Sequence, residues 1–185
     1  MYNYSYPQDK PQKRCVFLIM LHIITSQKEL AFAEIKRIYC ESILEQGSRD
    51  YMGFPENQRL LEAERDFYFY LKDFLKQKDS FLALWAPEKT AVAALRCEPY
   101  RDGFLIEGLE TAPDSRNRGY ASCLLGEVLG YLYSVNPAPV YSHILKHNLS
   151  SLRVHEKCGF KLLSDMAVYI DGSADFRCNT YCYKK

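Results

Sequence analysis

The sequence has almost no net charge and no block of like charges. Its 24 Lys and Arg residues and 23 Asp and Glu residues are interspersed, which leaves a net charge of +1. Surfaces that bind nucleic acid or anionic membranes need clustered basic residues. The composition therefore gives no indication of a nucleic-acid or membrane partner.

The sequence also lacks a hydrophobic run long enough to cross a bilayer. Its candidate is CVFLIMLHII, ten residues at 15–24 behind Lys13 and Arg14, which imitates a secretory signal peptide. A membrane span needs about 20 apolar residues, and the charged stretch QKEL interrupts before any cleavage site. We interpret 15–25 as a buried strand, residues 1–14 as a loose arm, and 15–185 as a single domain.

The seven cysteines do not form a regular spacing pattern of the kind that indicates a disulfide framework. Their number is odd and most lie in apolar stretches, which favours free thiols in a reducing, cytoplasmic chain. Cys178 and Cys182 are four apart but have no second cysteine pair beside them. His143 and His147 have the same spacing but fall in strand-like sequence. We therefore predict no metal site.

Neither common nucleotide fingerprint, G-x-G-x-x-G or G-x-x-x-x-G-K-[ST], occurs in the chain. What does occur is PDSRNRGYA at 113–121, between an apolar strand and an apolar helical stripe. The first amides of a helix have no internal partner and attract anions, and Gly119 lets an anion approach the backbone. With Arg116 and Arg118 nearby, the turn predicts a phosphate or pyrophosphate site. The alternative is an ordinary capped helix with surface arginines.

Helical and strand periodicities alternate along the chain in the order β-α-α-β-β-β-α-β-α-β-β. This order predicts an α/β (α+β) fold with a mixed central sheet of six to seven strands, flanked by about four helices. We expect the first helix to start at Ser26, in a capping box with Glu29, and to end at Gly47. The expected strands are about 15–25, 80–86, 90–98, 104–111, 140–146, 161–170 and 176–184.

Two segments resemble the GNAT N-acetyltransferase superfamily. The first is R-x-x-G-x-A, formed by Arg116, Gly119 and Ala121, and it is similar to the superfamily's pyrophosphate-binding motif. The second is N-x-x-S-x-x-x-H-E-K-C-G-F, from Asn148 to Phe160. The resemblance is detailed over 90–163 and implies a GNAT-like fold that uses acetyl-CoA as co-substrate.

The resemblance also implies where acetyl-CoA would bind, in an opening between two central strands. We expect Gly108 to form a bulge that splays the sheet. The residues expected to contact acetyl-CoA come from the fourth strand, the turn, and the helix after the fifth strand. They are Leu109, Glu110, Thr111, Arg116, Asn117, Arg118, Gly119, Tyr120, Ala121, Ser122, Asn148 and Ser151.

A carboxylate in the apolar run FLIEGL is the candidate general base. Glu107 alternates with Leu105 and Leu109, so burial would raise its pKa toward a useful value. Glu110 is expected to point to the opposite face and ranks second. The amide of Leu109 could stabilise the developing oxyanion. The alternative for Glu107 is a carboxylate that is merely exposed or hydrogen-bonded.

One position departs from the superfamily pattern. Superfamily members often carry a tyrosine that protonates the departing thiolate, and the motif register places His155 there. We predict that His155 acts as this acid. The alternative is a helix histidine that makes a packing contact.

Together these features predict an N-acetyltransferase that acetylates a primary amine of a small molecule or peptide by direct attack in a ternary complex. A non-catalytic acyl-CoA-binding domain on the same fold is the alternative. The acceptor pocket would lie among the first two helices and the C-terminal hairpin. Phe67, Tyr68 and Tyr70 could line it or belong to the core, and a homodimer is left open.

Overall fold

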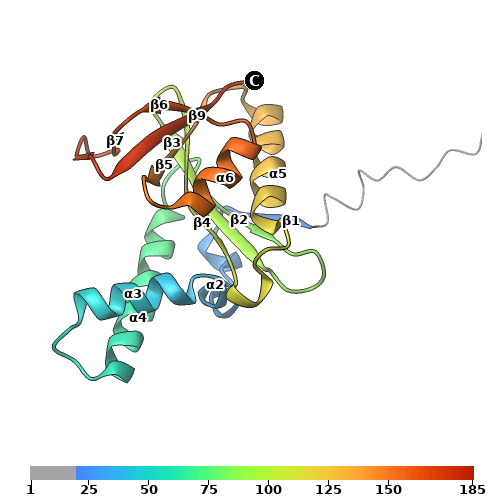
Figure 1. Cartoon of the computed structure of the whole chain (residues 1–185). Helices are drawn as coiled ribbons and strands as arrows, with labels where there is room; N and C mark the ends of the chain where they lie inside the picture. The colour runs from blue at the N-terminus through green and yellow to red at the C-terminus, as the bar shows by residue number, and fades with distance from the viewer. Residues whose placement is uncertain (1–19) are drawn as a thin grey trace, which may run out of the picture.

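The computed structural model describes residues 20–185 and is built around one seven-stranded sheet (Figure 1). The strand order is β1-β2-β3-β4-β5-β9-β6, and every neighbouring pair is antiparallel except β4 and β5, which are parallel. The predicted mixed sheet of six to seven strands is confirmed. The arm predicted at 1–14, and the first part of the strand predicted at 15–25, lie outside the described residues.

Most strands fall close to the predicted ranges, because each is a short apolar or alternating run bounded by turn residues. The sheet consists of β1 Leu21–Ile24, β2 Phe81–Trp85, β3 Ala93–Tyr100, β4 Gly103–Thr111, β5 Val140–Leu145, β6 Lys161–Ser164 and β9 Cys178–Tyr183. The strand expected at 161–170 is divided into two. After β6, the short strands β7 Ala167–Val168 and β8 Ala174–Asp175 form a separate hairpin.

The predicted helix from Ser26 to Gly47 is wrong. Ser26 caps only a short 3-10 turn, η1 Gln27–Glu29, by accepting a hydrogen bond from the amide of Lys28. Two helices follow, α2 Phe32–Ile38 and α3 Cys40–Asp50. Gly47 lies inside α3. A Cβ at this position would lie only 2.9 Å from the Arg59 carbonyl oxygen of α4. The glycine therefore permits close helix packing and does not end the helix.

Three further helices follow in the predicted order of elements. They are α4 Glu56–Phe74, α5 Tyr120–Val135 and α6 Leu149–Lys157. The helices α2, α3 and α4 pack on one face of the sheet, over β2 and β3. On the other face lies α5, whose apolar side chains at helical spacing are all buried, namely Leu124, Leu125, Val128, Leu129 and Leu132. The sheet is thus the middle of three layers (Figure 1).

The structure also bears on metal binding, disulfides and membrane spans. Within residues 20–185, no three His, Cys, Asp or Glu side chains gather in a way that could hold a metal ion. The six cysteines of this part of the chain are free thiols. None of its helices is both long and apolar enough to cross a membrane.

Candidate functional site

Two neighbouring strands in the middle of the sheet separate halfway along their length. The parallel strands β4 and β5 pair only over Phe104–Ile106 and Val140–Ser142. Beyond this point they part, and a cavity of about 790 Å³ opens between them. Its walls include 108–111 from β4, 143–145 from β5, and 119–122 at the start of α5. The opening predicted between two central strands is therefore present.

A β-bulge at Gly108 causes the separation. Ala94 and Arg96 of β3 are two residues apart, but their partners on β4, Glu110 and Glu107, are three apart. Gly108 has a φ of 56°, in the left-handed region that favours glycine. The extra residue bends β4 and increases its twist. The bulge expected at Gly108 is confirmed.

Replacing Gly108 with Ala is expected to destabilise the protein by about 1–3 kcal/mol. A Cβ at this position would lie 2.5 Å from Nη1 of Arg96, whose guanidinium is enclosed by aromatic rings and has little room to move. Urea unfolding measures the effect. The matched control is Gly126→Ala, because no atom lies within 4 Å of the place that a Cβ would take on that helical glycine. Equal stability of the two variants would contradict the role given to Gly108.

The bulge also corrects the expectation that Glu110 points away from Glu107. Ala94 and Arg96, which lie on the same face of β3, pair with Glu110 and Glu107 respectively. Both carboxylates therefore face α2, α3 and α4, and Glu110 accepts a hydrogen bond of 2.5 Å from Ser42 of α3. Burial raises the pKa of Glu110. The prediction assumed that side chains alternate strictly between the two faces of β4. The extra residue of the bulge shifts this alternation by one, so that Glu110 returns to the face of Glu107.

Glu107 follows the last residue of β4 that pairs with β5, and it lies beside a largely buried cation. Its Oε2 is 4.0 Å from Nη2 of Arg96, and its side chain is 25% exposed. The Arg96 guanidinium lies 5.1 Å and 5.9 Å from the ring centres of Tyr70 and Tyr39. Burial, and then the charge of Glu107, raise the pKa of the neighbouring Glu98. The carboxylates of Glu107 and Glu98 thus lie close together. The Arg96 guanidinium lies on the same face of the sheet, covered by Tyr39 and Tyr70.

A buried tyrosine fixes the peptide plane at the bulge. The Tyr39 hydroxyl donates a hydrogen bond of 2.6 Å to the Gly108 carbonyl oxygen. Burial raises the pKa of Tyr39, so the hydroxyl keeps the proton that it donates. In a trans peptide the next N–H, that of Leu109, points opposite to this carbonyl. The amide predicted to stabilise an oxyanion therefore has a fixed direction.

The turn before α5 presents backbone amides toward the cleft. After β4 come the 3-10 turn η2 Pro113–Ser115 and two residues with positive φ, Asn117 at 61° and Gly119 at 81°. Gly119 is the N-cap of α5, and no side chain caps the helix there. No atom lies within 4 Å of a Cβ built on Gly119, so its surroundings are open. This geometry suits an anion at the helix N-terminus.

The two arginines of the turn differ in their surroundings. Arg116 donates to the Thr111 carbonyl oxygen at 3.2 Å and to Oε2 of Glu41 at 2.6 Å. Its guanidinium therefore links α3 to the end of β4. Arg118 is exposed. The predicted residues Tyr120, Ala121 and Ser122 line the cavity at the first turn of α5.

The predicted contacts on the opposite wall are Asn148 and Ser151, and both line the same cavity. Asn148 is the N-cap of α6, and its Oδ1 accepts a hydrogen bond of 3.0 Å from the Ser151 amide. The second sequence motif therefore fixes the start of α6 against the cleft.

His155 belongs to α6 and lies on its buried side, away from the cleft wall. It is 1% exposed, and its Nδ1 donates to the Ser151 carbonyl oxygen at 2.8 Å. Its ring packs edge-on against Phe160, and Val154 lines the cavity instead. Burial lowers the pKa of His155, so its ring is neutral at neutral pH. This geometry favours the packing alternative, and an acid role for His155 stays a prediction.

Three residues in or beside this site were not singled out from the sequence, namely His143, which lines the cavity, and Tyr39 and Arg96, which contact Gly108 and Glu107. Tyr39 and Arg96 lie on different elements, and only the fold brings them together. His143 was considered from its spacing to His147 alone. The sequence does hold a pattern that could have indicated His143. It directly follows the apolar start of β5, as Glu107 directly follows the apolar start of β4, and the two positions are at the same level of the sheet.

Comparisons with known proteins agree with this geometry. The family model described as the acetyltransferase (GNAT) family matches residues 42–160. The PaiA N-acetyltransferase of Thermoplasma acidophilum in complex with coenzyme A has a TM-score of 0.60 and 14% identity, over 89% of this chain and 99% of that one. A GNAT-family acetyltransferase of Bacillus anthracis has a TM-score of 0.57 and 20% identity, over 89% and 95%.

A third structure is the ribosomal-protein-S18-alanine N-acetyltransferase of Escherichia coli. It has a TM-score of 0.57 and 14% identity, over 88% of this chain and 92% of that one. No curated protein sequence gave a significant match. At these identities the structural likeness establishes the fold, and the family model confirms the resemblance carried by the two motifs.

Proposed function

Because the chain belongs to the GNAT family of acetyltransferases, we propose that it transfers an acetyl group from acetyl-CoA to a primary amine of a small molecule or peptide. The observation that carries this proposal is the cleft between β4 and β5, with Glu107 on β4 where the strands part and an uncapped helix N-terminus among its walls. The amine attacks directly, within a ternary complex.

The residues of the cleft fit the parts of acetyl-CoA. Backbone groups of Leu109, Glu110 and Thr111 pair with the amide-containing arm, which continues the sheet where β5 has separated. Amides from Asn117 to Ser122 bind the pyrophosphate, since they lie at an uncapped helix N-terminus. Asn148 and Ser151 close the opposite side.

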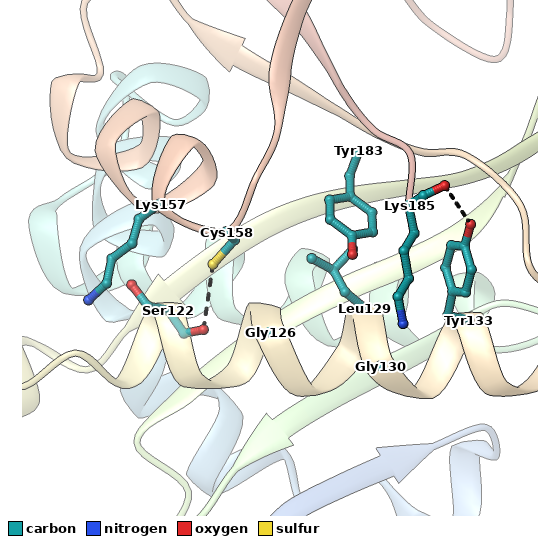
Figure 2. Close-up of a pocket in the computed structure, with 9 residues that line it drawn as sticks. All are labelled: Ser122, Gly126, Leu129, Gly130, Tyr133, Lys157, Cys158, Tyr183 and Lys185. Carbon is teal, nitrogen blue, oxygen red and sulfur yellow. Dashed lines mark hydrogen bonds between the residues drawn. The ribbon is translucent and has the colours of Figure 1, made fainter.

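A second hollow gives room for the nucleotide end of acetyl-CoA. It measures about 400 Å³ and lies between α5, the end of α6 and the C-terminus (Figure 2). Ser122 lines both this hollow and the cleft. Lys157 and Lys185 line it as well, so two cations are available for the phosphate on the ribose.

The chemistry requires a base, a fixed donor and an acceptor pocket. Acetyl-CoA supplies a thioester whose carbonyl carbon is attacked by the amine. Glu107 takes a proton from the acceptor's ammonium group, directly or through water. The Leu109 amide stabilises the charge that develops on the carbonyl oxygen. Tyr70 of α4 and the β7–β8 hairpin flank the site where the amine enters.

An acetyl-CoA turnover screen tests this function. The panel contains small amines, amino acids, polyamines, aminoglycosides and peptide N-termini, and a thiol reagent detects the coenzyme A released. We expect release to depend on at least one primary amine and to saturate with its concentration. Release that is independent of every amine would contradict the proposal.

A further inference from the structure

One histidine faces the point where the cleft begins. Ile106 and Ser142 form the last parallel pair of β4 and β5, so Glu107 and His143 come next on the two strands. Leu105 and Tyr141, two positions back, pack in one buried cluster, which places Glu107 and His143 on the same face of the sheet. His143 also lines the cleft. It therefore lies on the strand next to that of the candidate base, at the same level of the sheet.

The His143 ring is held in place but has no hydrogen-bond partner. It packs edge-on between Tyr100 and Tyr169, with ring-centre distances of 5.4 Å and 5.2 Å. Within residues 20–185, neither Nδ1 nor Nε2 has a partner, and both are shielded from solvent. A neutral imidazole offers one acceptor and one donor. Unpaired buried polar atoms are rare in folded proteins, so two on one cleft residue point to a ligand.

The surroundings of His143 keep the ring neutral. Burial, and then the charge of Arg101 on the β3–β4 turn, lower the pKa of His143 to about 4. Tyr100 faces it from β3 and Tyr169 from the β7–β8 hairpin, where burial raises the pKa of the Tyr169 hydroxyl. Tyr169 and His143 are therefore in contact, on the face of the sheet that also carries Glu107.

Amide formation from a protonated primary amine removes two protons from its nitrogen. Glu107, as proposed above, takes the first and makes the nitrogen nucleophilic. The second is lost only after the nitrogen has bonded to the carbonyl carbon, when its positive charge makes it strongly acidic. A weak base is sufficient for this second step, and a neutral imidazole supplies one.

We propose that His143 is a catalytic residue that carries the second proton from the acceptor nitrogen to the departing sulfur. The N–C bond forms with the amine's electron pair, and a ring nitrogen of His143 takes the proton. The C–S bond breaks with its electron pair going to sulfur, which then takes this proton from the imidazolium. Transfer is favourable because a thiol holds a proton more tightly than this imidazolium does. This step rests on the proposed amine acetylation.

The variant His143→Phe separates chemistry from packing. Phenylalanine keeps the edge-on contacts with Tyr100 and Tyr169 but removes both unpaired nitrogens. We expect kcat to fall by about 10²-fold or more, with the KM for acetyl-CoA within about 2-fold of wild type. The melting temperature should be equal or higher, because unsatisfied polar atoms have been removed. His22→Phe, at an exposed histidine of β1, is the control and should retain wild-type kcat.

The outcomes separate this inference from the proposed function. A folded His143→Phe protein with wild-type kcat on the best amine of the panel would overturn the role of His143 and leave amine acetylation intact. If the wild type acetylates no amine, both proposals fail. A matched fall in kcat and melting temperature would also contradict the proposal, since a packing residue behaves in that way.

Stability against pH gives a readout that needs no acceptor. A buried histidine with a lowered pKa is neutral in the folded protein while the unfolded chain is protonated below about pH 6.5. Its penalty is therefore absent above that pH and grows as pH falls toward about 4. We expect His143→Phe to lose less stability than wild type between these values. Identical losses would contradict the buried, unpaired state of the ring.

Discussion

Replacing Glu107 with Gln is expected to lower kcat by about 10²–10⁴ while acetyl-CoA affinity stays unchanged. Gln preserves the shape of the side chain beside Arg96 but cannot take a proton. The acceptor ammonium then depends on solvent for deprotonation, so activity should recover in part as pH rises toward the pKa of the amine. Initial rates at saturating acetyl-CoA measure the loss, and calorimetry measures the affinity.

The control for this variant is Glu88→Gln, which makes the same change on the exposed β2–β3 turn. It should retain wild-type kcat. If Glu107→Gln turns over at the wild-type rate at neutral pH and saturating amine, Glu107 is not the base. Glu110, the second candidate, which lines the cleft and whose pKa is raised by burial, would then be the next residue to test.

Replacing Gly119 with Asp is expected to weaken acetyl-CoA binding by about 2–4 kcal/mol, or about 30-fold to 1000-fold. The new carboxylate would lie at the helix N-terminus that we assign to the pyrophosphate, and it would repel the anion and compete for the same amides. The fold should tolerate the change, because no atom lies within 4 Å of a Cβ at this position. Calorimetric titration with acetyl-CoA measures the effect.

Gly119→Asn is the matched control, since Asn has nearly the same size as Asp and also tolerates the left-handed backbone. It should weaken binding much less than Gly119→Asp does. If both variants bind acetyl-CoA like the wild type, the anion site lies elsewhere. If both lose affinity equally, the backbone conformation of the glycine is responsible and the charge is not.

The sequence was most informative for features that depend only on residues close together in the chain. The α5 stripe and the turn at Gly119 are both of this kind, and each was located correctly from its pattern. Gly108 was also assigned correctly to a bulge, because glycine inside an apolar strand has few other uses. These local features, with the two motifs, were sufficient to indicate the fold and the cofactor.

The features that were wrong or missed depend on contacts distant in the sequence. The direction of Glu110 was reversed because alternation could not show how many residues the bulge inserts. Gly47 was assigned to a helix end because its contact with α4 could not be seen in the chain. Arg96 became recognisable only once aromatic rings from two helices enclosed it. In each case tertiary packing overrode a local preference.

Transfer of a labelled acetyl group tests the central claim most directly. The protein is incubated with acetyl-CoA carrying ¹³C in its acetyl group and with the amine of the panel that gives the fastest coenzyme A release. Mass spectrometry then locates the label. We predict label in an amide on the acceptor nitrogen, in an amount equal to the coenzyme A released, and at a much lower rate with Glu107→Gln. Label found only in free acetate, with none on any amine, would contradict the account.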